Sequence, residues 1–107
     1  MGFDSIFMDT HESGLALLAA AMGLEAALGA GSKGANVTDE VASRCAFRVE
    51  ANNAERVKLM KEMRDFYKCR SDLAHGRIRR LRGEDLDWLY WGQKMLERVL
   101  KRELMGL

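Results

Sequence analysis

The sequence contains no proline, the residue that interrupts helices most strongly. Valine and isoleucine are also scarce, whereas alanine, leucine, methionine, glutamate and arginine, which form helices readily, are common. No segment alternates apolar and polar residues as a half-buried strand does. With 107 residues the chain has the length of one domain. We therefore expect a single all-α domain that spans residues 1–107.

Cysteine is rare as well, and its two positions do not indicate a metal site. Cys45 and Cys69 lack the Cys-x-x-Cys or Cys/His spacing of zinc proteins, so we expect buried free thiols in a reducing compartment, and no cofactor. The first eight residues lack the basic start and apolar run of a signal peptide. Glu25 interrupts the apolar segment 15–30, which is too short to span a bilayer. These absences favour a cytoplasmic protein without a membrane partner.

Charge of neither sign dominates the chain, whose formal net charge is +1. The two halves nevertheless differ. Residues 1–53 carry three Lys or Arg against seven Asp or Glu, whereas residues 54–107 carry 14 against nine. The net charge therefore says little about partners, but the basic second half is the part in which an anionic partner is expected to bind.

Apolar periodicity and glycine stops divide the chain into four predicted helices with short connections, which is typical of a helical bundle. The first helix is apolar on nearly all sides, so we expect it to be the most buried, with Thr10 or Ser13 as its cap. Asn52 and Asn53 are expected to form the turn and cap before the third helix. Gly92, on the apolar stripe of the fourth, indicates a close helix crossing. The expected bounds are about 11–28, 38–51, 54–74 and from 84 onwards.

The third predicted helix carries one arginine on its apolar side. At roughly 100° per residue, one side holds apolar residues and the other holds mainly Lys, Arg and Asp, yet Arg70 falls near the middle of the apolar side. An isolated buried guanidinium is too unfavourable to persist, so it needs a partner. In a structural interpretation Arg70 pairs with a carboxylate such as Glu25 or extends its head to the edge of the helix. In a functional interpretation it points into an anion-binding groove.

His75 closes the same predicted helix. A histidine suits a helix C-terminus, where the dipole favours its charged form, and this structural explanation needs no function. Five residues separate His75 from Arg70, so the two side chains point roughly 140° apart on one regular helix. They do not form a compact pair within one copy. They could converge if two copies of the helix faced each other across a two-fold axis.

The segment Phe66-Tyr-Lys-Cys-Arg-Ser-Asp-Leu-Ala-His-Gly76 resembles the signature helix of the HEPN superfamily, specifically its Apea-like branch. That branch often reads Tyr-x-x-Arg-Ser-x-x-x-His-Gly, and the upstream segment Leu24-Glu-Ala-Ala-Leu-Gly29 with its glycine loop is also similar to the family. The resemblance covers roughly residues 15–77. It falls on Tyr67, Arg70, Ser71, His75 and Gly76.

The resemblance implies a helical domain that dimerises through the motif helix, with two arginines and two histidines in one cleft. Many HEPN proteins are metal-independent endoribonucleases, acting as toxins, in defence or in RNA processing, and others are non-catalytic binding modules. Active members often have Asn, Asp or His after the motif arginine, whereas the Apea-like branch has Ser, as here. The expected partners are thus a second copy, RNA, and an antitoxin or other protein.

Residue chemistry suits such a reaction. An imidazole titrates near the working pH, so His75 could take the proton of the attacking 2′-hydroxyl. A guanidinium is a planar fork of donors, so Arg70 could stabilise charge on the phosphorane. We assign supporting roles to Ser71, as a hydrogen-bond partner of His75, and to Asp72, as an orienting group. The products would carry 2′,3′-cyclic phosphate ends.

Four arginines directly after His75 form a candidate RNA-binding segment. A solvated helix end, balanced by the acids at 84, 85 and 87, is an equally good explanation. Trp88, Tyr90 and Trp91 could stack on bases, although an aromatic cluster early in a helix more often belongs to the core or to a dimer interface. Three functions stay open: an endoribonuclease, a non-catalytic module that binds a protein or nucleotide, and a purely structural helical dimer. The four arginines are Arg77, Arg79, Arg80 and Arg82.

Overall fold

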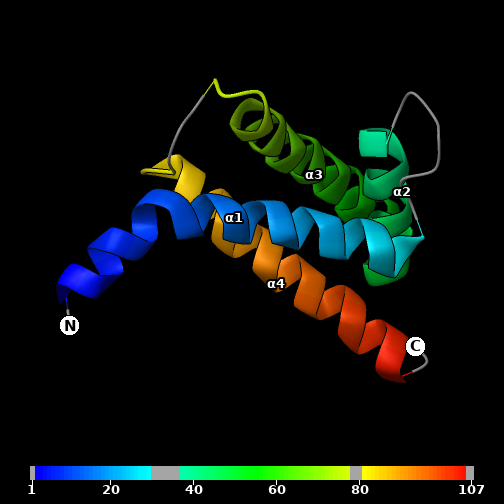
Figure 1. Cartoon of the computed structure of the whole chain (residues 1–107). Helices are drawn as coiled ribbons and strands as arrows, with labels where there is room; N and C mark the ends of the chain where they lie inside the picture. Colours follow the sequence, from blue (N-terminus) through cyan, green and yellow to red (C-terminus); the bar gives the residue numbers. More distant parts are fainter. Residues whose placement is uncertain (1, 30–36, 78–80, 106–107) are drawn as a thin grey trace.

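The computed structural model of the chain consists of four α-helices (Figure 1). It describes residues 2–29, 37–77 and 81–105, and side chains from residue 12 to 104 within these ranges. No strand occurs in these ranges, so the all-α prediction is confirmed for them. None of the helices described is long and apolar enough to cross a membrane. The helices are α1 (Gly2–Leu28), α2 (Val37–Val49), α3 (Asn53–Ala74) and α4 (Glu84–Met105).

The local signals that end and start helices hold for α3 and α4, whereas α2 ends at Val49, two residues before its expected end at 51. Asn52 caps α3, because its side-chain oxygen accepts a hydrogen bond of 2.8 Å from the backbone N–H of Glu55. Three acids lie in the first turn of α4, where the helix dipole favours negative charge. The predicted apolar stripe of α2 is its buried face, and it consists of Val41, Ala42, Cys45, Ala46 and Val49.

The prediction for the start of α1 was wrong. The helix begins at Gly2 rather than near His11, and Ser13 lies inside it as a buried residue instead of capping it. No glycine or proline lies between Gly2 and Gly14, so nothing in that segment stops a helix. One side of α1 also stays exposed. Leu15 and Met22 are 65% and 64% exposed, so α1 is not buried all round as its composition suggested.

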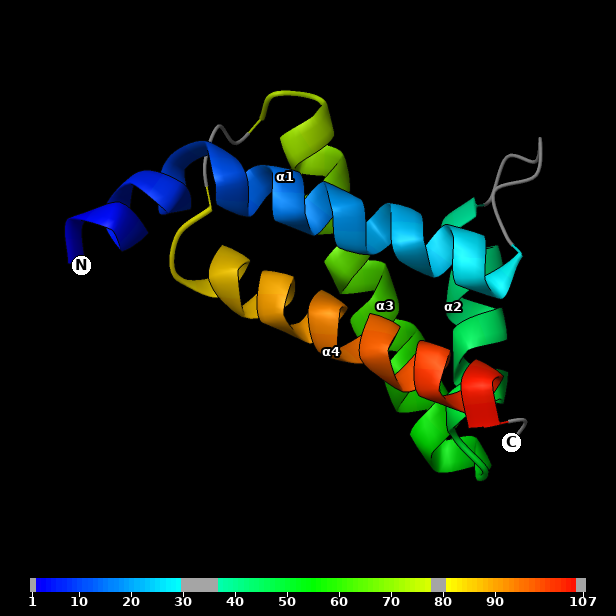
Figure 2. The same ribbon diagram turned by 60° about the horizontal axis from the view of Figure 1, so that its bottom comes forward.

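The helices pack in two main pairs, α1 against α4 and α2 against α3. In both ribbon views α1 and α4 run in the same general direction, and the view of Figure 2 shows α3 crossing them at a steep angle (Figures 1 and 2). Side chains from all four helices form one core, whose largest fully buried members are Phe66, Leu17, Leu24 and Met63.

Gly92 allows α3 and α4 to approach closely. A Cβ atom at this position would lie 2.7 Å from Cζ of Phe66 and would also meet its Cε1 atom. Only glycine leaves room for the ring there. Phe66 in turn packs against Trp91, with 5.3 Å between ring centroids, and edge-on against Tyr67. The predicted close crossing at Gly92 is confirmed.

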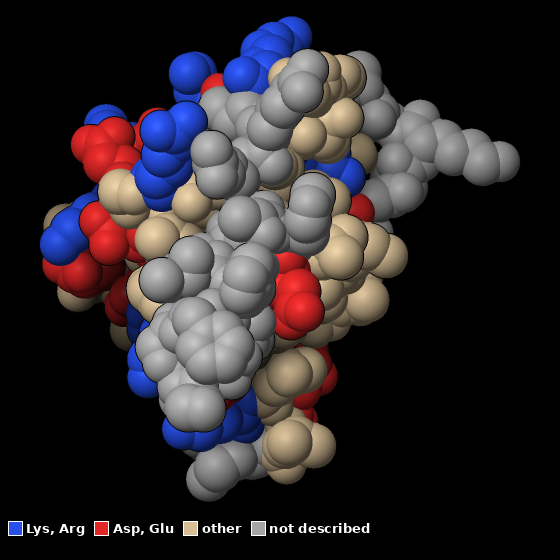
Figure 3. All heavy atoms as spheres, turned by 60° about the vertical axis from the view of Figure 1, so that its left-hand side comes forward, with Lys and Arg blue, Asp and Glu red and all other residues tan. Residues whose placement is uncertain are grey.

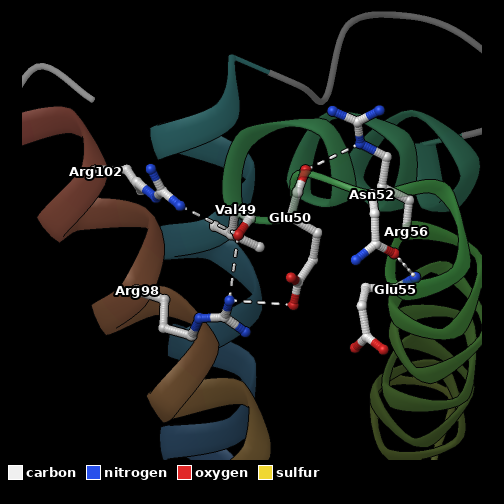
Figure 4. A network of polar contacts seen from close by, with 7 residues as sticks. All are labelled: Val49, Glu50, Asn52, Glu55, Arg56, Arg98 and Arg102. Carbon is white, nitrogen blue, oxygen red and sulfur yellow. Dashed lines mark hydrogen bonds and ion pairs between the residues drawn. The ribbon is translucent and has the colours of Figure 1, made fainter.

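Three arginines of α3 and α4 bond to the C-terminus of α2 (Figure 4). Nη2 of Arg98 donates to the carbonyl of Val49 and lies 3.2 Å from the Glu50 carboxylate. Arg102 donates to the same carbonyl, and Nε of Arg56 donates to the carbonyl of Glu50. Helix-end carbonyls have no partner within their own helix, so these donors satisfy groups that would otherwise rely on water.

Candidate functional site

Arg70 lies on the inner side of α3, as the helical pattern predicted. The side chain as a whole is only partly buried, but its Nε atom is fully buried and has no hydrogen-bond partner. A buried N–H without an acceptor loses its hydrogen bonds to water and gains none. Arg70 is therefore partly exposed as a residue while its Nε atom lies inside the protein, which is compatible with a side chain that extends its head toward the edge of the helix.

Glu25 does not serve as the partner of Arg70 among the contacts of the described residues. Its carboxylate accepts a hydrogen bond of 2.9 Å from the hydroxyl of Tyr67, which also lies 3.3 Å from the carbonyl oxygen of Ala21. Burial raises the pKa of the Tyr67 hydroxyl, the bond to Glu25 raises it further, and the charge of Arg70 opposes both. The predicted pairing of Arg70 with Glu25 is therefore replaced by a tyrosine–carboxylate contact between α3 and α1.

The motif ends in a helix-stopping turn. Gly76 has a positive φ of 75°, its N–H donates to the carbonyl of Leu73, and the N–H of Arg77 donates to the carbonyl of Asp72. These two bonds form a Schellman motif, in which His75 is the C-cap. The geometry of this turn thus explains why a glycine follows the motif histidine. It also fixes where Arg77 leaves the helix.

His75 is exposed at this end of α3. The bond that joins it to Ser71 is a backbone bond of 2.9 Å, from the N–H of His75 to the carbonyl of Ser71. Within the described residues no side-chain bond between them was found, so the expected Ser71–His75 side-chain contact is absent there. Arg70 belongs to the inner face and His75 to the open end, so one copy of the chain does not bring the two groups together.

The carboxylate of Asp72 pairs with basic side chains rather than with His75. Its Oδ1 atom lies 3.3 Å from Nη1 of Arg77, and its Oδ2 atom lies 3.9 Å from Nζ of Lys68. Arg77 remains exposed. Of the other predicted RNA-binding residues, Arg82 is exposed, and its backbone N–H lies 3.4 Å from Asp85. Arg79 and Arg80 lie outside the described residues.

An acidic cleft of about 490 Å³ separates the end of α3 from the start of α4. Sγ of Cys69, which lines the cleft, lies 3.8 Å from Oδ1 of Asp85. Among the described residues, no group of three or more His, Cys, Asp or Glu side chains is arranged to hold a metal ion. On the face drawn in Figure 3, basic and acidic side chains lie next to each other rather than forming a field of one sign. The cleft is lined by Asp65, Lys68, Cys69, Asp72, Glu84, Asp85, Asp87 and Trp88.

The aromatic residues of α4 belong mainly to the core. Trp88 and Trp91 are partly buried and pack edge-on, with 5.6 Å between their centroids. Tyr90 is 61% exposed. The core interpretation is therefore confirmed for the two tryptophans, and of these three aromatic residues Tyr90 is the exposed one.

Sequence reasoning missed an arginine and phenylalanine cluster on α2. Phe47 is 60% exposed, and together with Leu28, Arg44 and Arg48 it lines a hollow of about 610 Å³. The signal available in the sequence was the position of Phe47 on its predicted helix. Phe47 lies off the apolar stripe of α2, between two arginines.

Both cysteines are free and buried, as predicted. Burial raises the pKa of the Cys45 thiol to about 12 and that of Cys69 to about 11, and the nearby Asp85 adds to the shift at Cys69. Thiols with such pKa values are almost entirely protonated near neutral pH, so neither is suited to nucleophilic chemistry.

A comparison of the chain with protein-family models, with curated proteins and with solved structures found no match.

Proposed function

We propose that the chain is a metal-independent endoribonuclease of the HEPN type, active as a homodimer in the cytoplasm and controlled by an antitoxin-like protein partner. The observation that carries the proposal is Arg70. Its buried Nε–H has no acceptor, although it lies in the motif that ends with an exposed histidine. A guanidinium binds a phosphate oxygen strongly, and Arg70 is partly exposed, so a bound RNA would contact its terminal nitrogens rather than the buried Nε.

The proposed reaction is an internal transesterification. His75 of one copy takes the proton of the 2′-hydroxyl, the 2′-oxygen bonds to phosphorus, and the bond to the 5′-oxygen breaks. His75 of the second copy donates a proton to that leaving oxygen. Arg70 stabilises the charge on the non-bridging oxygens as the phosphorane forms. The products are a 2′,3′-cyclic phosphate and a 5′-hydroxyl, without a metal ion.

A second copy is required, because His75 and Arg70 do not meet within one chain. The outer face of α3 is charged and unsuited to close apolar contact, whereas α1 offers an exposed apolar stripe next to α3. The side of α1 that adjoins this stripe contacts the motif helix, since Tyr67 bonds to Glu25 and Leu73 packs beside Gly14. We therefore place the dimer interface along α1 and the adjoining edge of α3. The stripe consists of Leu15, Ala19, Met22 and Ala26.

The test is RNA cleavage in EDTA. The wild-type chain should yield 2′,3′-cyclic phosphate ends, and His75→Ala and Arg70→Met should each lower the rate by at least 100-fold. Arg64→Met is the matched control, because it removes an exposed arginine from the same helix, one that forms an ion pair with Asp39. It should retain the wild-type rate. Unchanged cleavage by His75→Ala, or no cleavage by the wild-type dimer, would contradict the proposal.

The acidic cleft favours one alternative, a non-catalytic HEPN-like module that binds a protein partner or nucleotide. Its five carboxylates lie beside the end of the motif and disfavour an approaching phosphate. A basic protein segment is the partner that this charge would attract. If the wild-type chain cleaves no RNA but retains a lysine- and arginine-rich peptide, with retention weakened in Asp87→Asn, the alternative is supported. Retention that Asp87→Asn leaves unchanged would count against it.

A further inference from the structure

Phe47 is a large aromatic side chain that the core does not use. The buried face of α2 is formed by other residues, and Phe47 points away from it with 60% of its surface exposed. A single exposed apolar residue needs no explanation. Phe47 differs in that cationic groups surround it and cover one of its two faces.

The guanidinium of Arg56, from the start of α3, covers one face of the Phe47 ring. Its Cζ atom lies 4.2 Å from the ring centroid, within the range of a cation–π contact. Arg56 is itself fixed by its bond to the Glu50 carbonyl. The ring is thus held from one side, and its exposure leaves the other available for a planar group.

Arg44 and Arg48 line the hollow beside the ring, and both are anchored. Nη1 of Arg44 donates to the carbonyl oxygens of Leu28 and Gly29 at 3.0 and 2.6 Å, and Nη2 pairs with Glu40 at 2.9 Å. Arg48 forms an ion pair with Glu103 from α4. A guanidinium has five N–H donors, so these contacts orient both arginines without saturating them.

We propose that Phe47, Arg44 and Arg48 form a binding site for one nucleotide of a single-stranded RNA. The base stacks on the open face of Phe47, and the adjoining phosphate accepts hydrogen bonds from the two arginines. A flat aromatic face between anchored cations matches a base joined to a phosphate better than it matches an acidic peptide, which would use the arginines but not the ring. The site lies at the opposite end of α3 from His75, so it does not depend on the proposed ribonuclease activity.

The test measures binding of a fluorescent single-stranded RNA of about 12 nucleotides, by anisotropy and in EDTA. The His75→Ala background keeps the RNA intact. Phe47→Ala should weaken binding by about tenfold, because stacking on an aromatic side chain contributes substantially per base, whereas Phe47→Trp should bind at least as tightly as Phe47. Val57→Ala is the control, since Val57 is also exposed, at 68%. It should leave binding unchanged.

A second pair of variants tests the phosphate contact. Arg48→Met should weaken binding and reduce the slope of log affinity against log salt by about one. Glu103→Gln should tighten binding, because it removes the carboxylate that competes for Arg48. Equal affinity for Phe47→Ala and Phe47→Trp would overturn the proposal, as would an acidic peptide that binds in a Phe47-dependent manner where the RNA does not. If the wild-type chain binds this RNA but does not cleave it, only the ribonuclease proposal is contradicted.

Discussion

Arg70 has a buried polar atom that the free chain leaves without a partner, and this has a consequence for stability. Replacing it with methionine keeps the length of the apolar stem and removes the unsatisfied N–H. We expect Arg70→Met to be as stable as wild type or more stable by about 1 kcal/mol. Urea unfolding followed by circular dichroism measures this. A loss above about 1 kcal/mol would mean that the native guanidinium has a stabilising partner.

Gly92 is expected to be the glycine least tolerant of a side chain. A methyl group there meets the Phe66 ring, which the core holds in place, so Gly92→Ala should lower the free energy of unfolding by about 3 kcal/mol. Gly23→Ala is the comparison, because its Cβ would meet the end of the flexible Leu96 side chain, and alanine favours a helix. Gly23→Ala should lower the free energy of unfolding by clearly less than Gly92→Ala. Equal losses would show that the crossing is not rigid.

The Cys45 thiol makes stability depend on pH in the alkaline range. Its pKa is about 12 in the fold against an ordinary value of 9.0, so above pH 9 the unfolded chain loses this proton first and stability falls. From pH 8 to pH 10 this thiol should account for a loss of about 1.4 kcal/mol. Cys69 and Tyr67 act in the same direction. Urea unfolding at both pH values should show a smaller loss in Cys45→Ala, and an equal loss would refute the assignment.

At the scale of the elements, the end of α3 depends on one backbone conformation. Gly76 has a positive φ, and no atom lies within 4 Å of a Cβ built there, so Gly76→Ala should be destabilising through strain alone, by about 1 kcal/mol. Gly76→Asn should lose less, since asparagine adopts this conformation more readily. Thermal unfolding of both variants measures the difference. Equal stability of Gly76→Ala and wild type would contradict a Schellman stop.

The elements themselves were predictable where the signals are local. Asn52, the acids that open α4, and Gly76 each determine a helix end through their immediate neighbours, and the structure agrees with all of them. The start of α1 was missed because Thr10 and Ser13 resemble caps although no residue there stops the helix. Cap residues are signals only where the chain also leaves the helix.

The candidate site was predictable only in part, because its contacts depend on packing. The helical period placed Arg70 on the inner face of α3, but it could not show that Tyr67 would occupy Glu25. Nor could it show that the turn at Gly76 brings Arg77 back to Asp72. The position of Phe47 off the apolar stripe of α2 was readable from the sequence, but its contact with Arg56 of α3 was not.

At the scale of the whole molecule, the proposed dimer uses the exposed stripe on α1. Light scattering during gel filtration should give twice the chain mass for wild type, and Met22→Asp should give monomers, because a carboxylate in an apolar interface stays unpaired. Val57→Asp introduces the same group at another exposed apolar position and should remain dimeric. A monomeric wild type would remove the basis for a shared Arg70–His75 cleft. A dimeric Met22→Asp would place the interface elsewhere.

The crossing of α3 and α4 limits how this sequence can change over evolutionary time. Since the space above position 92 is taken by the ring at position 66, a larger residue at one position requires a smaller one at the other. Homologues should therefore show linked substitutions at these two positions, with glycine accompanying an aromatic ring and alanine or serine accompanying a smaller aliphatic side chain.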